Sequence, residues 1–402
     1  EIFNRPNPSF TFDQAGVYEI ELVVTDTKGA QNSQKLEVVA GNDIPEVKIS
    51  MNGINQSFWF GEKELDYQVS VKDLEDGDTQ SGEIKEAEVA ITFDYVPEGF
   101  DPIEIASKQS GAETLASLTI GKNLIEGSDC KSCHQYKETS IGPSYEAVAA
   151  KYPNSPDNTN YLVGKIINGG AGVWGEHAMS AHPQLSEADA KRMVDFILSM
   201  DDAQATVASL PLNGKVQPMI PEGDNGQGGF LLRAAYTDKG SSKAPPLSSV
   251  DYVALRNPYL DPQLSVERKG VQLLTTPRVS FLMAGDNSSF ALDNIDLTGI
   301  TQIDLHVSVS TRNGAAGGIV EVRLGSANGE LLGTSNKVGV KEMGFRPPEG
   351  VDPIVWRREN ANRAQVSIKP TSGKQKLYFV FKNPEVKGEE ILMGINEIQF
   401  IK

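Results

Sequence analysis

The sequence is poor in cysteine and histidine, and its basic residues are outnumbered by acidic ones. Of 402 residues, 2 are cysteine and 4 are histidine, and 54 Asp and Glu face 37 Lys and Arg. The resulting net charge of −17 disfavours nucleic acid and anionic membranes as partners, because both are bound through basic patches. No apolar run approaches the roughly 18 residues of a membrane helix, so we expect no transmembrane segment. A charged segment followed by an apolar one is also missing at the start, so no signal peptide is shown.

The residues that are present suggest several domains. At roughly 150 residues per domain, the length favours two to four. A hydrophobic content of 39% supplies apolar material for separate cores. With 38 Gly and 22 Pro, we expect many turns and short strands.

Residues 1–42 alternate apolar and polar side chains in the way of β-strands, with Ile20, Leu22 and Val24 on one face. The strings 12–18 and 24–29 resemble the second half of a PKD domain, an immunoglobulin-like sandwich. That resemblance implies the C-terminal part of such a domain, in a chain cut from a longer protein. Residues 43–104 have the periodicity of a second, small immunoglobulin-like sandwich.

An acidic turn interrupts the second sandwich. Asp73, Glu75, Asp76 and Asp78 bring four carboxylates together around Gly77. Carboxylate oxygens are the ligands that Ca²⁺ takes in proteins, so these four form a candidate calcium site. The alternative is a solvated acidic turn, and the spacing does not match an EF-hand loop.

Residues 105–203 change to helical spacing. Helices are predicted over 112–127, 145–152, 161–168 and 186–200, the last with Ser186 as N-cap. Its residues Met193, Phe196, Ile197 and Met200 fall on one face. Residues 204–223 carry three prolines and read as a linker. Residues 224–402 return to short strands and are long enough for one β-sandwich.

The sharpest motif is Cys130-Lys131-Ser132-Cys133-His134, because the C-x-x-C-H spacing is that of c-type haem attachment. The two thiols on one turn can each form a thioether with a haem vinyl group, and the next residue aims an imidazole at the iron. A zinc site would need four ligands, and the sequence has no further cysteine. A thioredoxin-like pair would not require the adjacent histidine.

Together with Ile141-Gly142-Pro143 and the segment from Gly172 to Met179, this motif resembles class I bacterial cytochromes c. The resemblance implies one covalent haem c, with His134 as proximal and Met179 as distal iron ligand. It also implies that the Pro143 carbonyl orients the His134 imidazole and that Trp174 packs near the haem edge. His177 and His182 flank Met179, so ligation by two histidines stays open.

The C-terminal region carries four strings that resemble a family 6 carbohydrate-binding module, at residues 228–232, 294–300, 317–324 and 394–400. Such modules are jelly-roll β-sandwiches that hold sugars on aromatic rings. By this resemblance Trp356 is a candidate sugar-stacking residue, and Tyr236 is a second one. Both can instead be packed residues in a module that has become a spacer.

These parts predict a multidomain, mainly β chain of immunoglobulin-like sandwiches and a C-terminal jelly-roll sandwich, with one all-α class I cytochrome c domain. The domain order resembles exported Bacteroidetes proteins in which a quinoprotein sugar dehydrogenase-like domain often precedes the PKD domain. It implies electron transfer from an upstream or partner sugar dehydrogenase, docking to polysaccharide, a periplasmic or cell-surface location, and no enzyme activity in this chain. A haem-based enzyme or sensor and an adhesive surface protein are the alternatives.

Overall fold

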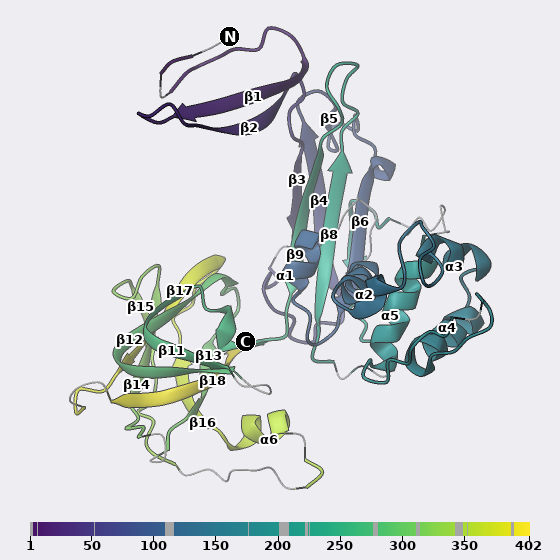
Figure 1. Cartoon of the computed structure of the whole chain (residues 1–402). Helices are drawn as coiled ribbons and strands as arrows, with labels where there is room; N and C mark the ends of the chain where they lie inside the picture. Colours follow the sequence, from purple (N-terminus) through teal and green to yellow (C-terminus); the bar gives the residue numbers. More distant parts are fainter. Residues whose placement is uncertain are drawn as a thin grey trace.

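The computed structural model describes residues 3–5, 7–51, 53–108, 116–175, 177–200, 209–221, 224, 226–275, 280–310, 314–341, 349–351, 353–386 and 390–402. Four bodies are visible in Figure 1: an N-terminal hairpin, a middle sandwich, a helical unit and a C-terminal sandwich. Within the described ranges, no helix is both long and apolar enough to cross a bilayer.

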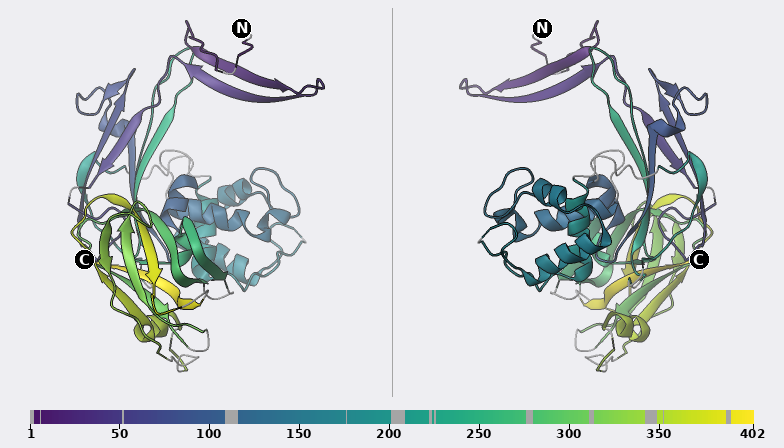
Figure 2. Two further views of the ribbon diagram at one scale, coloured as in Figure 1. Left: turned by 90° about the vertical axis from the view of Figure 1, so that its left-hand side faces the viewer. Right: turned by 90° about the vertical axis from the view of Figure 1, so that its right-hand side faces the viewer.

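The hairpin consists of β1 (Gly16–Thr25) and β2 (Gln31–Ala40), paired antiparallel along their whole length. Its turn forms because Asp26 Oδ1 accepts bonds from the backbone N–H of Lys28 and Ala30, at 2.8 and 2.9 Å. The hairpin projects from the rest of the chain (Figure 2). Its apolar side chains stay exposed, including Leu22 at 63% and Leu36 at 62%. The likeness to a PKD domain stays a prediction.

The middle sandwich has two sheets. One contains β3 (Glu46–Ser50), β4 (Leu65–Asp73), β5 (Gly77–Asp78) and β7 (Asn213–Val216), and the other has the order β6 (Val89–Val96), β8 (Gly229–Thr237), β9 (Ser248–Leu255). Every second residue of β4 is buried, as expected for a strand with one face on a core. The two sheets enclose one core, to which both β4 and β8 contribute.

This pairing corrects the expected boundaries at three places. Residues 43–104 do not form a sandwich by themselves, because β6 pairs with β8 from Val89↔Tyr236 to Val96↔Gly229. Part of the expected linker 204–223 is the strand β7, which pairs with β4. Consequently β8 and β9 belong to the middle sandwich and not to the C-terminal one. Alternation along a strand reports one buried face, but it does not say which strand lies beside it.

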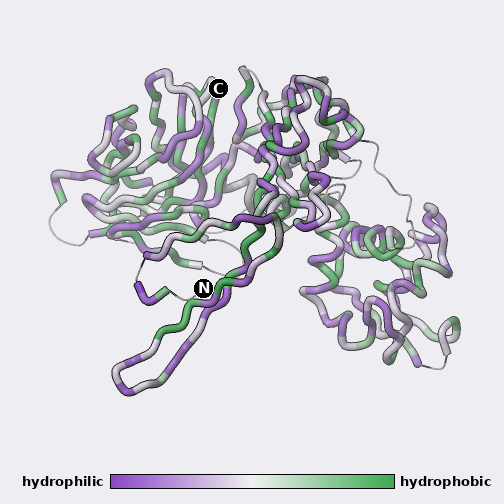
Figure 3. Tube along the Cα trace, turned by 90° about the horizontal axis from the view of Figure 1, so that it is seen from above, coloured by the Kyte–Doolittle hydropathy of each residue, from purple (hydrophilic) through white to green (hydrophobic). Residues whose placement is uncertain are grey.

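The helical unit lies between β6 and β7 in the chain. It contains α1 (Pro102–Lys108), α2 (Ala116–Glu126), α3 (Tyr145–Lys151), α4 (Pro156–Asn168) and α5 (Glu187–Leu198). Ser186 caps α5 as predicted, since its Oγ accepts from the Asp189 N–H at 3.0 Å. Met193 and Ile197 of α5 are buried in the core of the unit. In Figure 3 the unit lies on the side of the middle sandwich away from the C-terminal sandwich.

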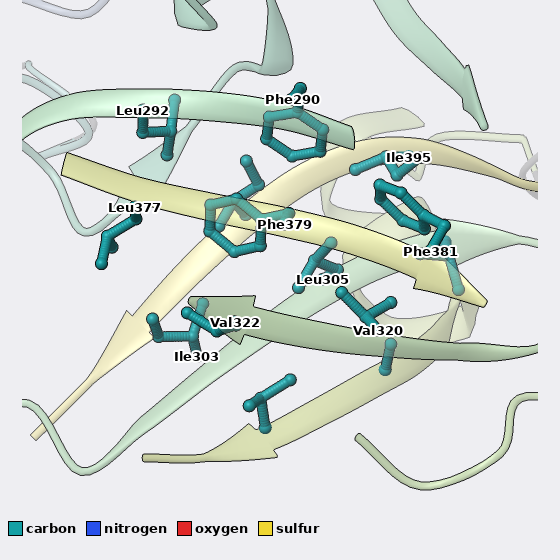
Figure 4. Packing of buried hydrophobic residues seen from close by; sticks show 14 of the residues in the cluster. Phe290, Leu292, Ile303, Leu305, Val320, Val322, Leu377, Phe379, Phe381 and Ile395 are labelled. Atoms are coloured by element: carbon teal, nitrogen blue, oxygen red, sulfur yellow. The ribbon is translucent and has the colours of Figure 1, made fainter. Parts of the chain in front are cut away.

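The C-terminal sandwich is a curled sheet. Its main path is β15 (Leu331–Thr334), β14 (Ile319–Leu324), β17 (Lys374–Lys382), β12 (Ser280–Asp296), β18 (Ile391–Ile401), β13 (Gln302–Ser308), β16 (Asn362–Ser367). Two further strands pair onto it, β10 (Tyr259–Leu260) on β18 and β11 (Glu267–Thr275) on β12, and α6 (Pro353–Asn360) precedes β16. The ends of the path meet, since Lys369 N–H donates to the Leu332 carbonyl at 3.1 Å. Figure 4 shows the enclosed core around Phe290 and Phe379, whose rings stack at 4.8 Å.

A segment of the middle sandwich completes this C-terminal core. Phe58, from the connection between β3 and β4, is 1% exposed and stacks on Phe400 with ring centroids 4.5 Å apart. Beside it, the buried Asn55 amide donates to the carbonyls of Asp296 and Thr298, at 2.8 and 3.0 Å. The two sandwiches are therefore joined by this segment of the middle sandwich, which is buried in the C-terminal core, as well as by the chain that runs from β9 to β10.

Candidate haem site and other candidate sites

The C-x-x-C-H motif lies on a short 3-10 turn, Asp129–Ser132. Ser128 starts the turn, and its Oγ accepts from the Cys130 N–H. The turn then closes tightly, because the Cys133 and His134 N–H groups both donate to the Cys130 carbonyl, at 3.1 and 2.9 Å. Both cysteines are free thiols, with Cys130 half-buried and Cys133 exposed. The local backbone thus presents two thiols and an imidazole from one turn.

The His134 ring is held on two sides. Its Nδ1 lies 2.7 Å from the Pro143 carbonyl, so Nδ1 carries the proton and Nε2 is the nitrogen left to bind a metal. The Tyr145 ring stacks on the imidazole at 5.6 Å. Gly142 passes so close that a Cβ there would lie 2.5 Å from the imidazole Cε1. A glycine is therefore required beside the ring, and the ring orientation is fixed by its surroundings.

Tyr145 is a buried polar residue next to this histidine. Its side chain belongs to the core of the helical unit, yet its hydroxyl has no hydrogen-bond partner among the described residues. Burial raises the pKa of Tyr145 well above its ordinary value. A buried hydroxyl without a hydrogen-bond partner lowers the stability of the fold. The site is therefore suited to a bound group that lies beside the rings of His134 and Tyr145 and offers the hydroxyl a partner.

Met179 lies on a loop that is tied to the end of α4. Gly170 and Met179 exchange both backbone hydrogen bonds, at 3.1 and 2.8 Å, and the Met179 side chain packs against the helical core. His182, three residues on, has its Nε2 3.3 Å from Asp129 Oδ1, and its side chain is 13% exposed. His177 is exposed. Of the two histidines near Met179, the less exposed one, His182, already contacts Asp129, which precedes Cys130.

Comparison with known proteins identifies this region. Residues 118–201 match the family model described as "Cytochrome c". Cytochrome c-552 of Nitrosomonas europaea is 40% identical over 78 residues, which are 19% of this chain and 76% of that protein. Cytochrome c-552 of Hydrogenobacter thermophilus is 41% identical over 88 residues, or 21% of this chain and 88% of that protein. The chain belongs to the cytochrome c family. The matched part, with α2 to α5, is called the cytochrome c unit below.

Solved structures give two kinds of neighbour. The Nitrosomonas europaea cytochrome c552 structure is 39% identical and covers 20% of this chain and 98% of that one, with a TM-score of 0.19. A family 6 carbohydrate-binding module from Clostridium cellulolyticum, solved in complex with xylose, is 21% identical. It covers 36% of this chain and 96% of that one, with a TM-score of 0.27.

The cytochrome c unit fits the covalent haem c that its family implies. Two thiols on one turn, a histidine with only Nε2 left for a metal, and a buried hydroxyl without a partner lie together. This donor set is suited to thioether attachment and iron ligation, and the family implies electron transfer. The sequence does not identify Tyr145 as part of the site and gives Gly142 only within the motif, because the role of both residues depends on where the His134 ring lies.

Trp174 lies on the loop that leads to Met179. Its side chain is 45% exposed, and the ammonium of Lys151 lies 4.6 Å from the centre of its ring. An exposed aromatic ring with a cation on one face can carry a contact of about 0.5–1 kcal/mol. The position near a haem edge stays a prediction.

The cytochrome c unit packs on one sheet of the middle sandwich. Ile105 of α1 and Ile120 of α2 share a buried cluster with Val96 of β6 and Leu231 of β8. Beside this cluster, Asp94 of β6 accepts from the Ala116 N–H, at the start of α2, at 3.2 Å. A carboxylate at a helix N-terminus satisfies a backbone donor that has no partner within the helix.

Asp94 also faces a buried cation, Arg233 of β8, which is 2% exposed. Burial raises the pKa of Asp94 to about 6, although the Ala116 N–H and the Arg233 charge act in the opposite direction. Burial likewise lowers the pKa of Arg233. Since both charged forms lose solvation here, the seam under α2 carries a pH-dependent free energy.

The acidic turn does not form the predicted calcium site. Asp73 Oδ1 accepts from the N–H groups of Glu75 and Asp76, Asp76 accepts from Tyr236 Oη at 2.7 Å, and Asp78 accepts from the Ser81 N–H. No group of three or more His, Cys, Asp or Glu within reach of one ion occurs in the part of the chain that the structure describes. These carboxylates are held by hydrogen bonds from their own loop and from β8, and Asp73 is 6% exposed, so the acidic turn is a hydrogen-bonded one and is not the solvated turn of the alternative.

Tyr236 is not a sugar-stacking residue. It lies on β8 in the core of the middle sandwich with 1% exposure, and its hydroxyl donates to Asp76. Trp356, the other candidate, lies on α6 and is half-buried. The structure therefore separates the two aromatic residues into different sandwiches, and only Trp356 remains a candidate in the C-terminal one.

Proposed function

We propose that this chain is an electron carrier with one covalent haem c, whose cytochrome c unit is mounted on a scaffold that binds polysaccharide. The observation that carries the proposal is the C-x-x-C-H turn with the His134 Nδ1–Pro143 hydrogen bond of 2.7 Å. Cys130 and Cys133 would form the thioethers, and His134 Nε2 would bind the iron. When bound, haem c supplies reversible one-electron chemistry at that iron.

We assign Met179 as the second ligand. Its loop is anchored by two backbone bonds to Gly170, and its side chain lies against the helical core. His182 is engaged by Asp129, and His177 points to solvent-exposed surface, so both are less suited to reach a buried iron. Ligation by Met179 and His134 would raise the reduction potential of the iron relative to stronger donors and would leave no ligand position open to a small molecule. Such a site accepts and returns electrons, and it is poorly suited to binding gases or activating peroxide.

The experiment that tests this assignment is optical spectroscopy of the haem-loaded protein. We expect a weak sulfur-to-iron charge-transfer band in the far red for the oxidised protein. Met179→Ala should abolish this band, lower the reduction potential and allow the ferrous protein to bind carbon monoxide. Met200→Ala, a change of the same side chain at a half-buried position just after α5, should leave the band in place. Loss of the band in His182→Ala instead would assign two histidines, and carbon monoxide binding by the intact protein would favour a sensor or enzyme.

For the scaffold, we propose that the C-terminal sandwich binds polysaccharide through Trp356. Support comes from the sequence strings that resemble family 6 modules and from the half-buried position of Trp356 on α6. Stacking of an aromatic ring on a sugar contributes on the order of 1 kcal/mol. We further propose an exported, periplasmic or cell-surface protein whose electrons come from a sugar dehydrogenase, as an upstream domain or a partner.

Affinity electrophoresis of the whole chain in gels with neutral polysaccharides tests the sugar site. Retardation that is lost in Trp356→Ala would support it. Trp59→Ala is a control, because Trp59 is a partly buried tryptophan that packs against the core of the middle sandwich. A protein that no neutral polysaccharide retards, or one whose retardation is unchanged in Trp356→Ala, would reduce this domain to a spacer or an adhesive surface.

A further inference from the structure

The C-terminal sandwich carries a polar row across the outer face of its sheet. Lys269 of β11 is paired with Ser289 of β12, Ser289 with Val380 of β17, and Val380 with Glu321 of β14. Residues that are direct partners across strands point to the same face of a sheet. The residues one step along, such as Phe290 and Phe379, point into the core in Figure 4. Lys269, Ser289, Val380 and Glu321 therefore all lie on the face opposite the core.

This face is hollowed. A cavity of about 340 Å³ lies over the row, lined by Lys269, Asn287, Ser289, Arg323, Asn328 and Lys382 together with Ala327 and Val380. Two polar residues of the row are almost fully covered, Ser289 with 5% and Glu321 with 9% exposure. The volume is at the lower end of the roughly 300–1,000 Å³ of small-ligand pockets. The hollow is thus large enough for one sugar unit and has a polar floor.

The charge of the hollow is positive although the chain carries a net charge of −17. The lining has three cations, and Glu321 holds two of them in place. Arg323 Nε donates to Glu321 at 2.8 Å, and Lys382 Nζ donates to it at 2.9 Å. Burial alone would raise the pKa of Glu321, but these bonds outweigh it and hold the pKa below its ordinary value. The three cations Lys269, Arg323 and Lys382 outnumber this one buried carboxylate, so the lining keeps an excess of positive charge. Asp286, bound by Asn287 at 2.7 Å, lies beside the rim.

The fixed cations keep donors for a ligand. Arg323 has five N–H groups. Its Nε and Nη2 are bonded to Glu321 and its Nη1 to the Gly329 carbonyl, which leaves one N–H on each terminal nitrogen. A guanidinium that is already oriented by a buried carboxylate can bind a second oxyanion without a loss of rotamer freedom. The amides of Asn287 and Asn328 at the rim add donors and acceptors that suit hydroxyl groups.

We propose that this hollow binds the acidic group of a polysaccharide, a carboxylate or a sulfate ester, with the attached sugar unit over Val380. The proposal rests on the proposed function in so far as the C-terminal sandwich docks to polysaccharide, but it uses a surface apart from Trp356. A chain with a net charge of −17 repels polyanions as a whole, so its overall charge would not bring about binding of an acidic polysaccharide. Binding of the acidic group must therefore depend on the cations that line this hollow.

The test measures binding of the whole chain to three probes: polygalacturonate as the carboxylate polymer, a sulfated galactan and a neutral galactan. The variant is Lys269→Glu, since Lys269 is exposed at the rim and its change leaves the buried Glu321 cluster intact. The matched control is Lys374→Glu, an exposed lysine on β17 outside the hollow. We expect one acidic polymer to bind and Lys269→Glu to weaken it about tenfold, as for loss of one charge-assisted hydrogen bond. Lys374→Glu should bind like the parent.

The outcomes separate this inference from the proposed function. Trp356→Ala should abolish binding of neutral polysaccharide and leave binding of the acidic polymer, and the preferred polymer tells carboxylate from sulfate. If neither acidic polymer binds, or if both lysine variants weaken binding equally, the hollow is not an acidic-sugar site. Failure of neutral binding alone would overturn only the role of Trp356.

Discussion

The cytochrome c unit and the two sandwiches are built from the sequence in opposite ways. The core of the cytochrome c unit comes from one continuous stretch, between Leu124 and Met200. The core of the middle sandwich comes from stretches on both sides of that unit, from Val47 to Ile91 and from Val216 to Leu255. The C-terminal core needs Phe58, which lies far upstream of its other members. A continuous domain can be recognised from local motifs, whereas an interleaved one cannot.

The comparison also concerns what holds each part together. In the cytochrome c unit, the chemistry is concentrated in one turn and the ring of His134. In the sandwiches, stability depends on contacts between residues about two hundred positions apart, such as the Ile49 N–H with Asp251 at 2.7 Å. Changes in the first region should therefore affect the cofactor locally, and changes in the second should affect two domains together.

The largest effect is expected for Cys130→Ala combined with Cys133→Ala. Without either thiol no thioether can form, so all covalent haem should be lost, as measured by mass spectrometry after acid–acetone extraction. The unfolding transition of the sandwiches should persist, because among the described residues none of the cytochrome c unit belongs to their two main cores. Lys131→Ala on the same turn is the control and should keep its haem. Covalent haem on the double variant would disprove the attachment site.

The next effect tests how the Phe58 segment couples the two sandwiches. Phe58→Ala removes a fully buried ring that stacks on Phe400, so we expect a loss of about 3–5 kcal/mol in the free energy of unfolding. Both sandwiches should lose stability, as measured by calorimetry or denaturant titration. Leu74→Ala, at a side chain that is 77% exposed, should change stability by no more than about 0.5 kcal/mol. Independent unfolding of the two sandwiches would show that the buried Phe58 segment does not couple them.

A smaller effect concerns pH at the seam between the cytochrome c unit and the middle sandwich. The pKa of Asp94 is raised to about 6 by burial, above the roughly 3.9 of an unfolded chain. The folded state therefore holds this proton more tightly, and its stability falls as the pH rises from about 4 to about 6. We expect a loss on the order of 2 kcal/mol across that window, seen as a lower unfolding temperature.

The Asp94→Asn variant should lose this pH dependence while it keeps an acceptor for the Ala116 N–H. Asp66→Asn, at a carboxylate with 69% side-chain exposure, is the control and should titrate like the parent. If Asp94→Asn and the parent respond to pH in parallel, Asp94 does not set the stability of the seam.

The smallest effect is local to α5. Ser186 accepts from the Asp189 N–H and donates to the Asp189 carboxylate, at 3.0 and 2.8 Å. Ser186→Ala removes both bonds and should cost about 1 kcal/mol, measured as a lower unfolding temperature of the cytochrome c unit. Ser186→Asn should restore most of it. Equal stability of the two variants would show that the cap contributes nothing.

The helices and the haem-attachment turn could be predicted from the sequence because their signals are local. The N-cap at Ser186 and the buried face with Met193 and Ile197 lie where the periodicity indicates. Family membership of residues 118–201 agrees with the motif from Cys130 to His134.

The partners of the strands could not be predicted in the same way. A strand such as β8 has the same alternating or continuous apolar pattern whichever sheet it joins, and its partner β6 lies on the other side of the whole cytochrome c unit. For this reason the sequence pattern places Tyr236 in the wrong sandwich, and it predicts a calcium ligand at Asp76, which instead accepts from Tyr236. The hollow over Val380 depends on register between four strands, which no single segment contains.

The place where the chain leaves and re-enters the middle sandwich has a topological consequence. Residues on both sides of the cytochrome c unit are hydrogen-bonded to each other. The Ile91 N–H donates to Ser209 Oγ at 2.9 Å, and the Leu210 N–H donates to the Ile91 carbonyl at 3.0 Å. The cytochrome c unit is thus an insertion whose two connections to the middle sandwich lie side by side. A single peptide-bond cleavage on either flank leaves the unit covalently attached to the scaffold, so two cleavages are needed to set it free.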